Sequence, residues 1–190
     1  MDRTPSKRFD TALAMAIDKH RDQVRKGSDI PYISHLMAVS GLVLENGGDE
    51  DQAIAGLLHD AVEDAGGLET LKEIREQFGD RVANIVWDCT DAWENPKPPW
   101  RERKDAYLAK LPTKPRDSLL VSLADKVHNA RAIRIDYHEL GDELWGRFAG
   151  GKDGTIWYYR ALSRTFSKVM PGRLADTLAR LVADFDGSRD

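Results

Sequence analysis

Apolar residues recur at helical spacing along most of the chain, and this periodicity constrains the fold more than any other feature. One such stripe comprises Ile54, Leu57, Leu58, Ala61, Val62 and Ala65. This spacing places the apolar side chains on one face of an amphipathic helix. No stretch alternates apolar and polar residues over more than a few positions, as a half-buried strand would. The sequence therefore predicts an all-α fold, a bundle of about eight to ten helices.

Glycine and proline residues separate the periodic segments and predict where helices begin and end. The first helix is expected to end near Lys26 and Gly27, before the loop GSDIPY. A second begins at His35, and a third runs from the segment NGGDE to Gly66-Gly67. The proline-rich segment ENPKPP is expected to be an irregular loop. The remaining helices are expected over 68–78, 82–93, 100–110, 116–137, 153–169 and 173–185.

Length, charge and cysteine content limit the classes of protein that fit. The 190 residues suit one domain, residues 1–190, large enough to bury a core. The net charge of −4 and the pI near 5.8 argue against a partner made of DNA or RNA. Its only cysteine, Cys89, excludes an internal disulfide and favours a reducing cytoplasm. Without a signal peptide or an apolar run of about 20 residues, the chain is expected to be cytoplasmic and free of membrane.

The segment LLHDAVEDA, residues 57–65, concentrates one histidine and three carboxylates without a lysine or arginine. It lies in a stretch of 45 residues, between Lys26 and Lys72, that holds nine carboxylates and no Lys or Arg. A helical wheel places the histidine and the three acids on one face, opposite the apolar stripe. A solvated polar face is the simplest alternative, but such faces normally interleave basic residues. We interpret the missing cation as a metal ion.

Adjacent His59 and Asp60 can offer a nitrogen and an oxygen to one ion, so further ligands should come from other helices. His35 lies in the same cation-free stretch and is the best nitrogen candidate. For another oxygen, Asp125 and Asn129 lie one turn apart on the segment SLADKVHNARAI. A carboxylate on such an apolar helix costs several kcal/mol to bury unless it is paired or bound to metal.

These residues together resemble one family. The set of His35, His59-Asp60 and Asp125 is similar to the H…HD…D signature of the HD superfamily of metal-dependent phosphohydrolases. The longer segments RKGSDIPYISH, LLHDAVED and SLADKVHNAR resemble successive motifs of the RelA/SpoT-homologue hydrolase domain. That family removes the 3′-pyrophosphate from alarmone nucleotides such as ppGpp, the signals of the stringent response. A chain with this domain alone resembles a small alarmone hydrolase, similar to the metazoan SpoT homologue.

The resemblance implies an HD-type metal-dependent phosphohydrolase fold with one divalent ion, typically Mn²⁺. The implied metal ligands are His35, His59, Asp60 and Asp125. Two imidazoles and two carboxylates with open positions suit Mn²⁺, which would acidify a bound water and polarise a phosphoryl oxygen. Glu63 and Asp64 match the catalytic acidic pair, one of which would take the proton of the water.

Substrate contacts follow from the same resemblance and from the distribution of basic residues. Asn129 matches a motif asparagine near the scissile phosphate, and Arg25 with Lys26 matches the pair that holds the nucleotide base and phosphates. Residues 97–116 hold seven Lys or Arg against two acids and either contact phosphate or form a solvated helix face. Tyr158 is a further candidate for stacking on, or hydrogen bonding to, the nucleotide.

Two departures from the family pattern leave the base open. Leu36 follows His35 where relatives usually have proline, and the segment TDAWENPKPPW is unlike the shorter segment usual there. Because such loops can line the base pocket, both (p)ppGpp and (p)ppApp stand as substrates, each cleaved to pyrophosphate and a nucleoside 5′-di- or triphosphate.

Two further readings stay open besides the alarmone 3′-pyrophosphohydrolase. One is another HD-family nucleotide phosphatase, for instance one that removes the 2′-phosphate of NADPH. The other is a nucleotide-binding module without catalysis, against which the intact acidic pair argues. The expected partner is a small-molecule nucleotide, and the sequence does not determine the oligomeric state or a role as antidote to a partner synthetase.

Overall fold

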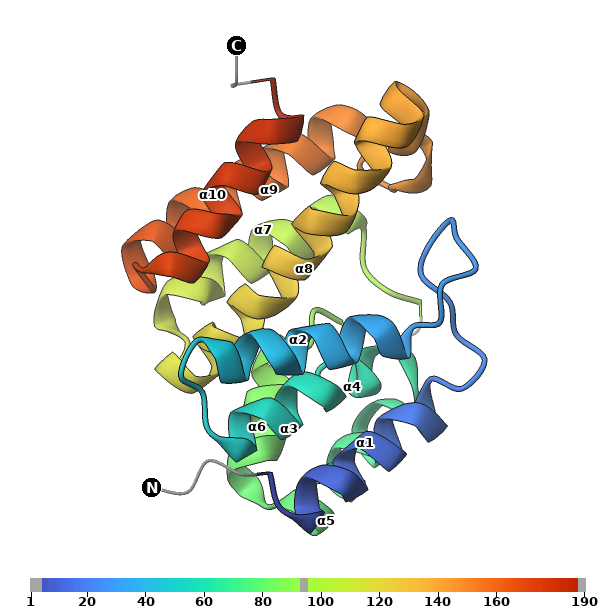
Figure 1. The fold of residues 1–190 in the computed structure, drawn as a ribbon, viewed down its shortest axis with the longest axis vertical. Helices are drawn as coiled ribbons and strands as arrows, with labels where there is room; N and C mark the ends of the chain where they lie inside the picture. Colours follow the sequence, from blue (N-terminus) through green and yellow to red (C-terminus); the bar gives the residue numbers. More distant parts are fainter. Residues whose placement is uncertain (1–4, 93–95, 188–190) are drawn as a thin grey trace. The chain divides into compact units, whose positions relative to one another are not determined.

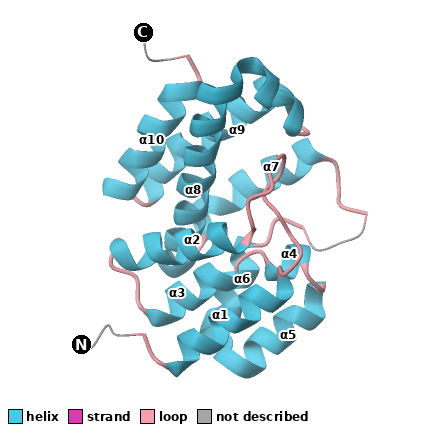
Figure 2. Ribbon diagram, turned by 45° about the vertical axis from the view of Figure 1, so that its right-hand side comes forward, coloured by secondary structure: helices cyan, strands magenta, loops and turns pink. Residues whose placement is uncertain are grey.

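The computed structural model describes residues 5–92 and 96–187. These residues form ten α-helices and two 3₁₀ segments and contain no β-strand, only an isolated bridge between Val24 and Pro31 (Figures 1 and 2). The predicted all-α class is therefore confirmed, and the helix count lies within the expected range. Among the helices in the described part of the chain, none has the length and apolarity needed to cross a membrane.

The helices follow one another with short connections. The first six are α1 (Lys7–Lys19), α2 (Ile33–Glu45), α3 (Glu50–Leu58), α4 (Ala61–Asp64), α5 (Gly67–Phe78) and α6 (Asp80–Cys89). The others are α7 (Trp100–Lys110), η1 (Leu111–Thr113), α8 (Arg116–Leu140), η2 (Gly141–Arg147), α9 (Gly151–Val169) and α10 (Arg173–Phe185).

The contacts within the chain group these elements into two compact units. The first unit comprises residues 1–97 and 115–124, and the second comprises residues 98–114 and 125–190. The boundary falls inside the continuous helix α8, between Ala124 and Asp125. Each unit has a buried core of its own. The single domain expected from the length of the chain stays a prediction.

In the first unit, α3 is the central helix and packs against α1, α2 and α6. Its start is fixed by a capping box in which Asp49 accepts from the backbone N–H of Gln52 and the Gln52 side chain accepts from that of Asp49. At Gly56 the helix α2 comes so close that an added Cβ would lie 3.1 Å from Cα of Ser40. A glycine at this position therefore permits the tight α2–α3 contact.

In the second unit, α9 packs against α10, α7 and η2. Its core is rich in aromatic side chains, and the ring of Phe185 contacts those of Trp145 and Tyr159, with centroids 6.2 and 5.7 Å apart. Trp100, in α7, lies against Gly150 and Gly154, where an added Cβ would lie 2.7 and 3.2 Å from the indole. Small residues at the start of α9 thus make room for the indole ring.

Two predicted helix ends differ from the observed ones. The first helix ends at Lys19 instead of near Lys26, because residues 20–32 fold into a loop with its own backbone hydrogen bonds. In that loop Arg25 donates to the carbonyl of Ile30, and Gly27 adopts a φ of 76° in the turn. The helix predicted over 82–93 ends at Cys89, and Trp93 lies outside the described residues.

The third predicted helix is interrupted in the middle of LLHDAVEDA. The helix α3 ends at Leu58, His59 and Asp60 form a turn, and the short helix α4 begins at Ala61. The helical wheel that placed all four polar side chains on one continuous face was therefore wrong. His59 is only 2% exposed, which also excludes the solvated polar face for this residue.

Candidate metal centre and active site

Two buried histidines from neighbouring helices form the middle of the candidate site. His35 lies in the first turn of α2 and is 0% exposed, while His59 directly follows α3. Their ring centroids are 5.2 Å apart. Because α2 and α3 approach closely at Gly56, two imidazoles that are 24 positions apart in the sequence converge.

A hydrogen bond determines which nitrogen of His59 can bind a metal. Nδ1 of His59 lies 2.8 Å from the carbonyl oxygen of Gly56. A carbonyl only accepts, so Nδ1 carries the proton and Nε2 of the neutral ring carries the lone pair. Nε2 in turn lies 3.1 Å from Oδ2 of Asp60. A lone pair and a carboxylate oxygen at this distance require a cation or a proton between them, so the donor set suits a divalent metal.

Asp60 lies at the start of α4 with its carboxylate beside both histidines. Its Oδ2 is 3.6 Å from Nε2 of His35, and the same oxygen accepts a hydrogen bond of 2.6 Å from the hydroxyl of Tyr32. The ring of Tyr32 also contacts that of His35 edge-on, with centroids 5.5 Å apart. Tyr32 therefore orients two candidate ligands, a role that the sequence analysis did not assign.

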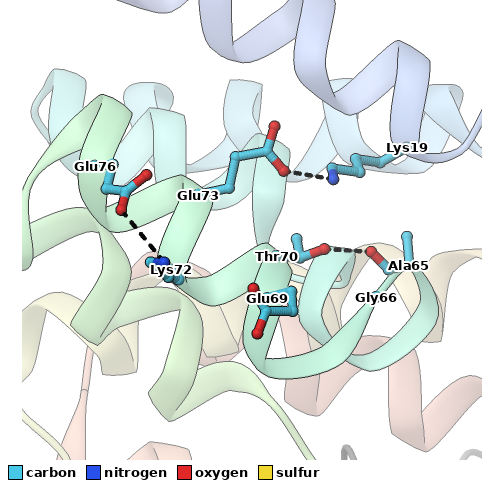
Figure 3. Close-up of a pocket in the computed structure, with 8 residues that line it drawn as sticks. All are labelled: Lys19, Ala65, Gly66, Glu69, Thr70, Lys72, Glu73 and Glu76. Carbon is cyan, nitrogen blue, oxygen red and sulfur yellow. Dashed lines mark hydrogen bonds and ion pairs between the residues drawn. The ribbon is translucent and has the colours of Figure 1, made fainter.

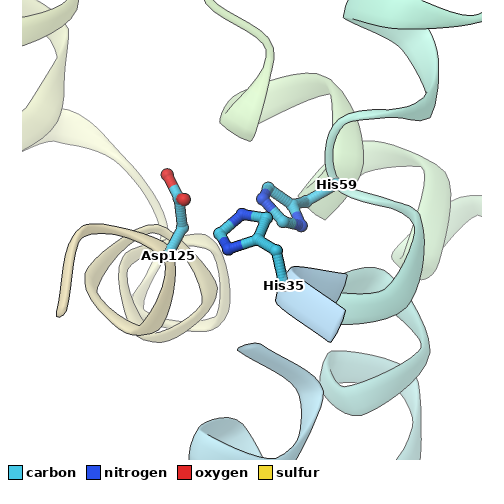
Figure 4. A group of neighbouring side chains, drawn as sticks. All are labelled: His35, His59 and Asp125. Carbon is cyan, nitrogen blue, oxygen red and sulfur yellow. The ribbon is translucent and has the colours of Figure 1, made fainter. Parts of the chain in front are cut away.

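Asp125 joins the two histidines in a group of candidate metal ligands (Figure 4). One ligand atom from each of His35, His59 and Asp125 lies within 4.8 Å of the other two, and all three residues are buried. Asp125 is placed by the continuous helix α8, one residue after Ala124. Three of the four predicted ligands thus form one group, and Asp60, beside the histidines, is not a member of it.

Both oxygens of Asp125 have partners on the same helix. Asn129 donates from Nδ2 to Oδ1 at 2.5 Å, and Nζ of Lys126 lies 2.6 Å from Oδ2. Burial lowers the pKa of Lys126, but the Asp125 carboxylate and nearby tyrosines outweigh that effect and hold the pKa well above its ordinary value. Lys126 is therefore a cation beside a candidate ligand. Its charge was overlooked because sequence reasoning treated this helix as apolar.

The predicted catalytic acids, Glu63 and Asp64, lie on α4; Glu63 is half-buried and Asp64 is exposed. Nζ of Lys97 lies 2.9 Å from Oε1 of Glu63 and 3.8 Å from Oδ1 of Asp64. The amide of Gln23 donates to Oδ2 of Asp64 at 2.9 Å. These contacts hold the acidic pair in place. Gln23 was not among the predicted site residues, and Lys97 was included only in the basic stretch 97–116, as a candidate for phosphate contact.

The cation-free stretch receives cations from elsewhere in the chain. Five of its nine carboxylates form ion pairs with a lysine or an arginine outside the stretch: Asp49, Glu50, Asp51, Glu63 and Asp64. The partners are Arg8, Arg81 and Lys97. The argument from missing cations therefore fails for these five acids, and the candidate metal site rests on the grouping of His35, His59 and Asp125.

The predicted substrate-binding pair lies on the loop between α1 and α2. The guanidinium carbon of Arg25 lies 5.5 Å from the ring centroid of Tyr32, whose hydroxyl binds Asp60. Lys26 is exposed at the turn of this loop. Tyr32, at the end of this loop, contacts His35 and Asp60, so the loop lies beside the candidate metal ligands. A phosphate role for Arg25 and Lys26 stays a prediction.

Tyr158 lies in the second unit and is 5% exposed. Its ring contacts those of Trp100 and Tyr107, with centroids 6.3 and 6.5 Å apart, and Nζ of Lys104 lies 5.1 Å from its centroid. The residue is thus part of the aromatic core, as the sequence also allowed, and its contact with substrate stays a prediction.

A surface hollow of about 400 Å³ lies elsewhere on the first unit, against α1 and α5 (Figure 3). Its polar lining consists of ion-paired side chains, with Lys19 bound to Glu73 at 2.6 Å and Lys72 to Glu76 at 3.9 Å. None of the predicted site residues lines this hollow. The histidine group and the acidic pair are therefore the better candidate for chemistry.

Comparison with known proteins agrees with this arrangement. The HD-domain family model matches residues 12–156. Over 126 residues the chain is 39% identical to guanosine-3′,5′-bis(diphosphate) 3′-pyrophosphohydrolase MESH1 of Xenopus tropicalis, covering 65% of this chain and 68% of that one. It is also 35% identical over 126 residues to a probable GTP pyrophosphokinase of Mycobacterium leprae, of which it covers only 16%.

Among solved structures, the fold is similar to that of a metazoan orthologue of SpoT that hydrolyses ppGpp. The TM-score is 0.79 at 25% sequence identity, with 95% of this chain and 96% of that chain covered. HD domains bind divalent metal ions, and His35, His59 and Asp125 form a candidate site for one here. From the matched residues and these relatives, the chain belongs to the HD-domain family, in the branch of the RelA/SpoT-homologue hydrolases.

Proposed function

We propose that the chain is a cytoplasmic, Mn²⁺-dependent hydrolase that removes the 3′-pyrophosphate from (p)ppGpp or (p)ppApp. The observation that carries the proposal is the convergence of two buried imidazoles and a buried carboxylate, with an acidic pair on the adjoining helix α4. A relative that is 39% identical over 126 residues is named as a guanosine-3′,5′-bis(diphosphate) 3′-pyrophosphohydrolase, and a protein of similar fold is described as hydrolysing ppGpp.

The metal would be held by His35, His59, Asp60 and Asp125. The Nδ1–H of His59 is fixed on Gly56, so its Nε2 lone pair points toward the carboxylate oxygen of Asp60. When bound, a divalent ion supplies Lewis acidity and lowers the pKa of a coordinated water. Imidazole and carboxylate ligands suit Mn²⁺ among several first-row metals.

The acidic pair would move the protons of the reaction. Glu63 or Asp64 accepts a proton as the water oxygen bonds to the phosphorus attached to the 3′-oxygen. The bond between that phosphorus and the 3′-oxygen breaks, and the 3′-oxygen takes up a proton. The products are pyrophosphate and the nucleoside 5′-di- or triphosphate. Lys97 and Gln23 hold the two carboxylates in a fixed orientation for this transfer.

The remaining residues would position the substrate. Arg25 and Lys26 carry positive charge on the loop that Tyr32 ties to Asp60, where base and phosphates of a nucleotide can be bound. Asn129 fixes Asp125 through its amide, and a second hydrogen bond from the same group can reach a phosphate oxygen.

One assay separates this function from its closest competitor. The purified chain is treated with EDTA and supplied with Mn²⁺, and ppGpp, pppGpp, ppApp, pppApp and NADPH are offered in parallel. Pyrophosphate should appear only with Mn²⁺ and only from the alarmones. Release of orthophosphate from NADPH, without pyrophosphate from any alarmone, would identify a 2′-phosphatase instead. Tight binding of alarmone without turnover under any divalent metal would indicate a binding module.

A further inference from the structure

We propose that His20 is a positioning residue whose single buried imidazole holds both the predicted catalytic acid Asp64 and the candidate metal ligand Asp60. It acts on Asp64 through Gln23 and on Asp60 through Tyr32. All five residues belong to the first unit. The roles of the two acids rest on the proposed function, whereas the contacts of His20 follow from the geometry alone.

The backbone places His20 beside Gln23, and Gln23 beside Tyr32. His20 directly follows α1, and its N–H donates to the carbonyl of Ala16 at 3.2 Å. The N–H of Gln23 donates to the carbonyl of His20 at 3.1 Å, and the N–H of Tyr32 donates to that of Gln23 at 2.9 Å. His20 is 3% exposed, so packing restricts its ring as well. The two ends of the loop 20–32 are therefore held together by main-chain contacts.

The first branch runs from the imidazole to the catalytic acid. Nδ1 of His20 lies 2.6 Å from Oε1 of Gln23, and Nε2 of Gln23 donates to Oδ2 of Asp64 at 2.9 Å. A carboxylate only accepts, so the amide nitrogen of Gln23 faces Asp64 and the amide oxygen faces His20. That oxygen also only accepts, so Nδ1 of His20 carries a proton. The imidazole thus holds the amide in the orientation that donates to Asp64.

The second branch runs from the face of the imidazole to the candidate ligand. The ring of His20 stacks on that of Tyr32, with centroids 5.2 Å apart and planes 22° apart. The hydroxyl of Tyr32 donates to Oδ2 of Asp60 at 2.6 Å. A stacked neighbour restricts the ring of Tyr32 to the orientation in which its hydroxyl reaches this oxygen. The first branch needs the Nδ1 proton and the second needs only a ring, so each can be removed separately.

Packing alone does not account for an imidazole at this position. Nε2 of His20 is buried and has no hydrogen-bond partner within the described part of the chain. Burying a polar nitrogen without a partner costs free energy, which an apolar ring of similar shape would avoid. What the imidazole adds over such a ring is the Nδ1–H group that binds Gln23. The residue is therefore suited to orienting the amide that contacts Asp64.

Three substitutions separate the two branches. His20→Phe keeps a ring against Tyr32 and removes the donor to Gln23. His20→Asn keeps an N–H donor near the position of Nδ1 and removes the ring. Gln23→Leu interrupts the first branch at a half-buried side chain. The control is Ser40→Ala, which removes a different buried hydrogen bond of the first unit, that of 2.9 Å to the carbonyl of Ala53. With the full chain, we would measure kcat, the KM for ppGpp and the Mn²⁺ concentration that gives half-maximal activity.

His20→Phe and Gln23→Leu should each lower kcat about tenfold or more, because Asp64 loses its fixed orientation. The KM and the Mn²⁺ concentration should stay as in the wild type. The double variant should lose no more than either single variant, since both changes interrupt one branch. His20→Asn should keep most of kcat but raise the Mn²⁺ concentration about tenfold, because Tyr32 is no longer held. Ser40→Ala should change none of these quantities.

A second measurement is independent of catalysis and of whether the His20 variants fold. Nitrogen-15 NMR spectra of the full chain in EDTA report which nitrogen of each imidazole carries the proton. His20 should carry it on Nδ1, and Gln23→Leu should reduce the share of this tautomer. A purely structural histidine would show no dependence on Gln23, and its substitution would not separate kcat from the Mn²⁺ concentration. Circular dichroism melting curves check the folding of each variant.

The proposal is overturned if His20 of the wild type carries its proton on Nε2 alone, or if the losses in kcat of His20→Phe and Gln23→Leu multiply in the double variant. Its failure differs from failure of the proposed function. A chain that cleaves no alarmone but shows the Gln23-dependent tautomer would retain the network and remove the reaction. Cleavage of ppGpp with an unchanged kcat in both His20→Phe and Gln23→Leu would do the reverse.

Discussion

The histidine group and a lysine–tyrosine cluster in the second unit use opposite chemistry to organise charge. The lysine–tyrosine cluster consists of Lys104, Lys114, Lys126, Tyr107 and Tyr158. In the histidine group, buried lone pairs and carboxylate oxygens face one another, as with Nε2 of His59 and Oδ2 of Asp60 at 3.1 Å. In the cluster, ammonium groups lie against aromatic faces, as with Lys114 over Tyr107 at 4.0 Å. The first arrangement suits a divalent cation, whereas the second places positive charge against the faces of aromatic rings. The contact between Asp125 and Lys126 joins the two arrangements on one helix.

The two arrangements also differ in how they are encoded. The residues of the histidine group come in short motifs, such as His59-Asp60, because one turn of backbone presents both ligands. Lys104 and Lys114 lie in the basic stretch 97–116, whereas Lys126 comes from α8. A ligand set built on local motifs can therefore be predicted from sequence, whereas the contact of Lys126 with the ring of Tyr107 depends on tertiary packing.

The largest effect should follow from removing an imidazole. His59→Ala removes the imidazole whose Nδ1–H donates to Gly56 and whose Nε2 is left to bind metal. We expect alarmone hydrolysis to fall by at least ~10⁴-fold, because the metal and its activated water are lost together. Metal content by mass spectrometry and pyrophosphate release measure the two consequences. His138→Ala, which changes an exposed histidine of α8, is the control and should alter neither. Normal Mn²⁺ content and turnover in His59→Ala would contradict the assigned centre.

A smaller loss should follow from changing an acid while leaving the ligands intact. Glu63→Gln keeps the size of the side chain but cannot accept a proton, so turnover should fall by ~10²–10⁴-fold. Binding of Mn²⁺ and of substrate should remain, as measured by calorimetry. Glu69→Gln changes an exposed acid nearby and should leave turnover unchanged. Undiminished turnover in both Glu63→Gln and Asp64→Asn would remove the acidic pair from the mechanism.

The next effect tests whether the surroundings of the ligands matter. Tyr32→Phe removes the hydroxyl that donates to Asp60 at 2.6 Å but retains the ring against His35. Loss of a hydrogen bond that orients a ligand typically lowers metal affinity or activity ~10–100-fold. The concentration of Mn²⁺ that gives half-maximal activity should rise accordingly. Tyr137→Phe is the control, because it removes a hydroxyl that is hydrogen-bonded to the carboxylate of Asp142. It should not change the Mn²⁺ concentration that gives half-maximal activity.

The helical class and most helix positions could be predicted because apolar periodicity is a local property of the sequence. The interruption at His59-Asp60 was missed because both residues keep right-handed helical backbone angles and neither is a glycine or proline. The end of α1 at Lys19 was missed for a different reason. The loop that follows is stabilised by pairing of Gln23 with Tyr32 and of Arg25 with Ile30, which periodicity does not report.

Candidate ligands could be predicted, but their supporting residues could not. Tyr32 lies inside a quoted motif, and its position three residues before His35 was a usable signal that it contacts the site. Lys97 lies 34 positions from Glu63, inside the proline-rich segment ENPKPP, and no local pattern relates the two residues. Ion pairs over such separations depend on the tertiary fold, which is why a stretch without lysine or arginine was read as uncompensated.

The smallest expected effect concerns an exposed ion pair of the second unit, between Lys152 and Asp142. The hydrogen bond from Lys152, 2.7 Å from Oδ1, lowers the pKa of Asp142 below its ordinary value of 3.8, and Trp145 adds a second donor. The folded state binds a proton at Asp142 less readily than the unfolded state does. The contribution of this carboxylate to the stability of the fold is therefore fully present above pH 3.8 and is lost as the pH falls through the lowered pKa. Asp142→Asn should therefore destabilise the fold slightly at pH 7, and the difference from the wild type should shrink as the pH falls below 3.8. Urea unfolding at pH 7 and pH 3 measures this, with Asp153→Asn as control. A difference that is as large at pH 3 as at pH 7 would mean that Asp142 acts through packing and not through its charge.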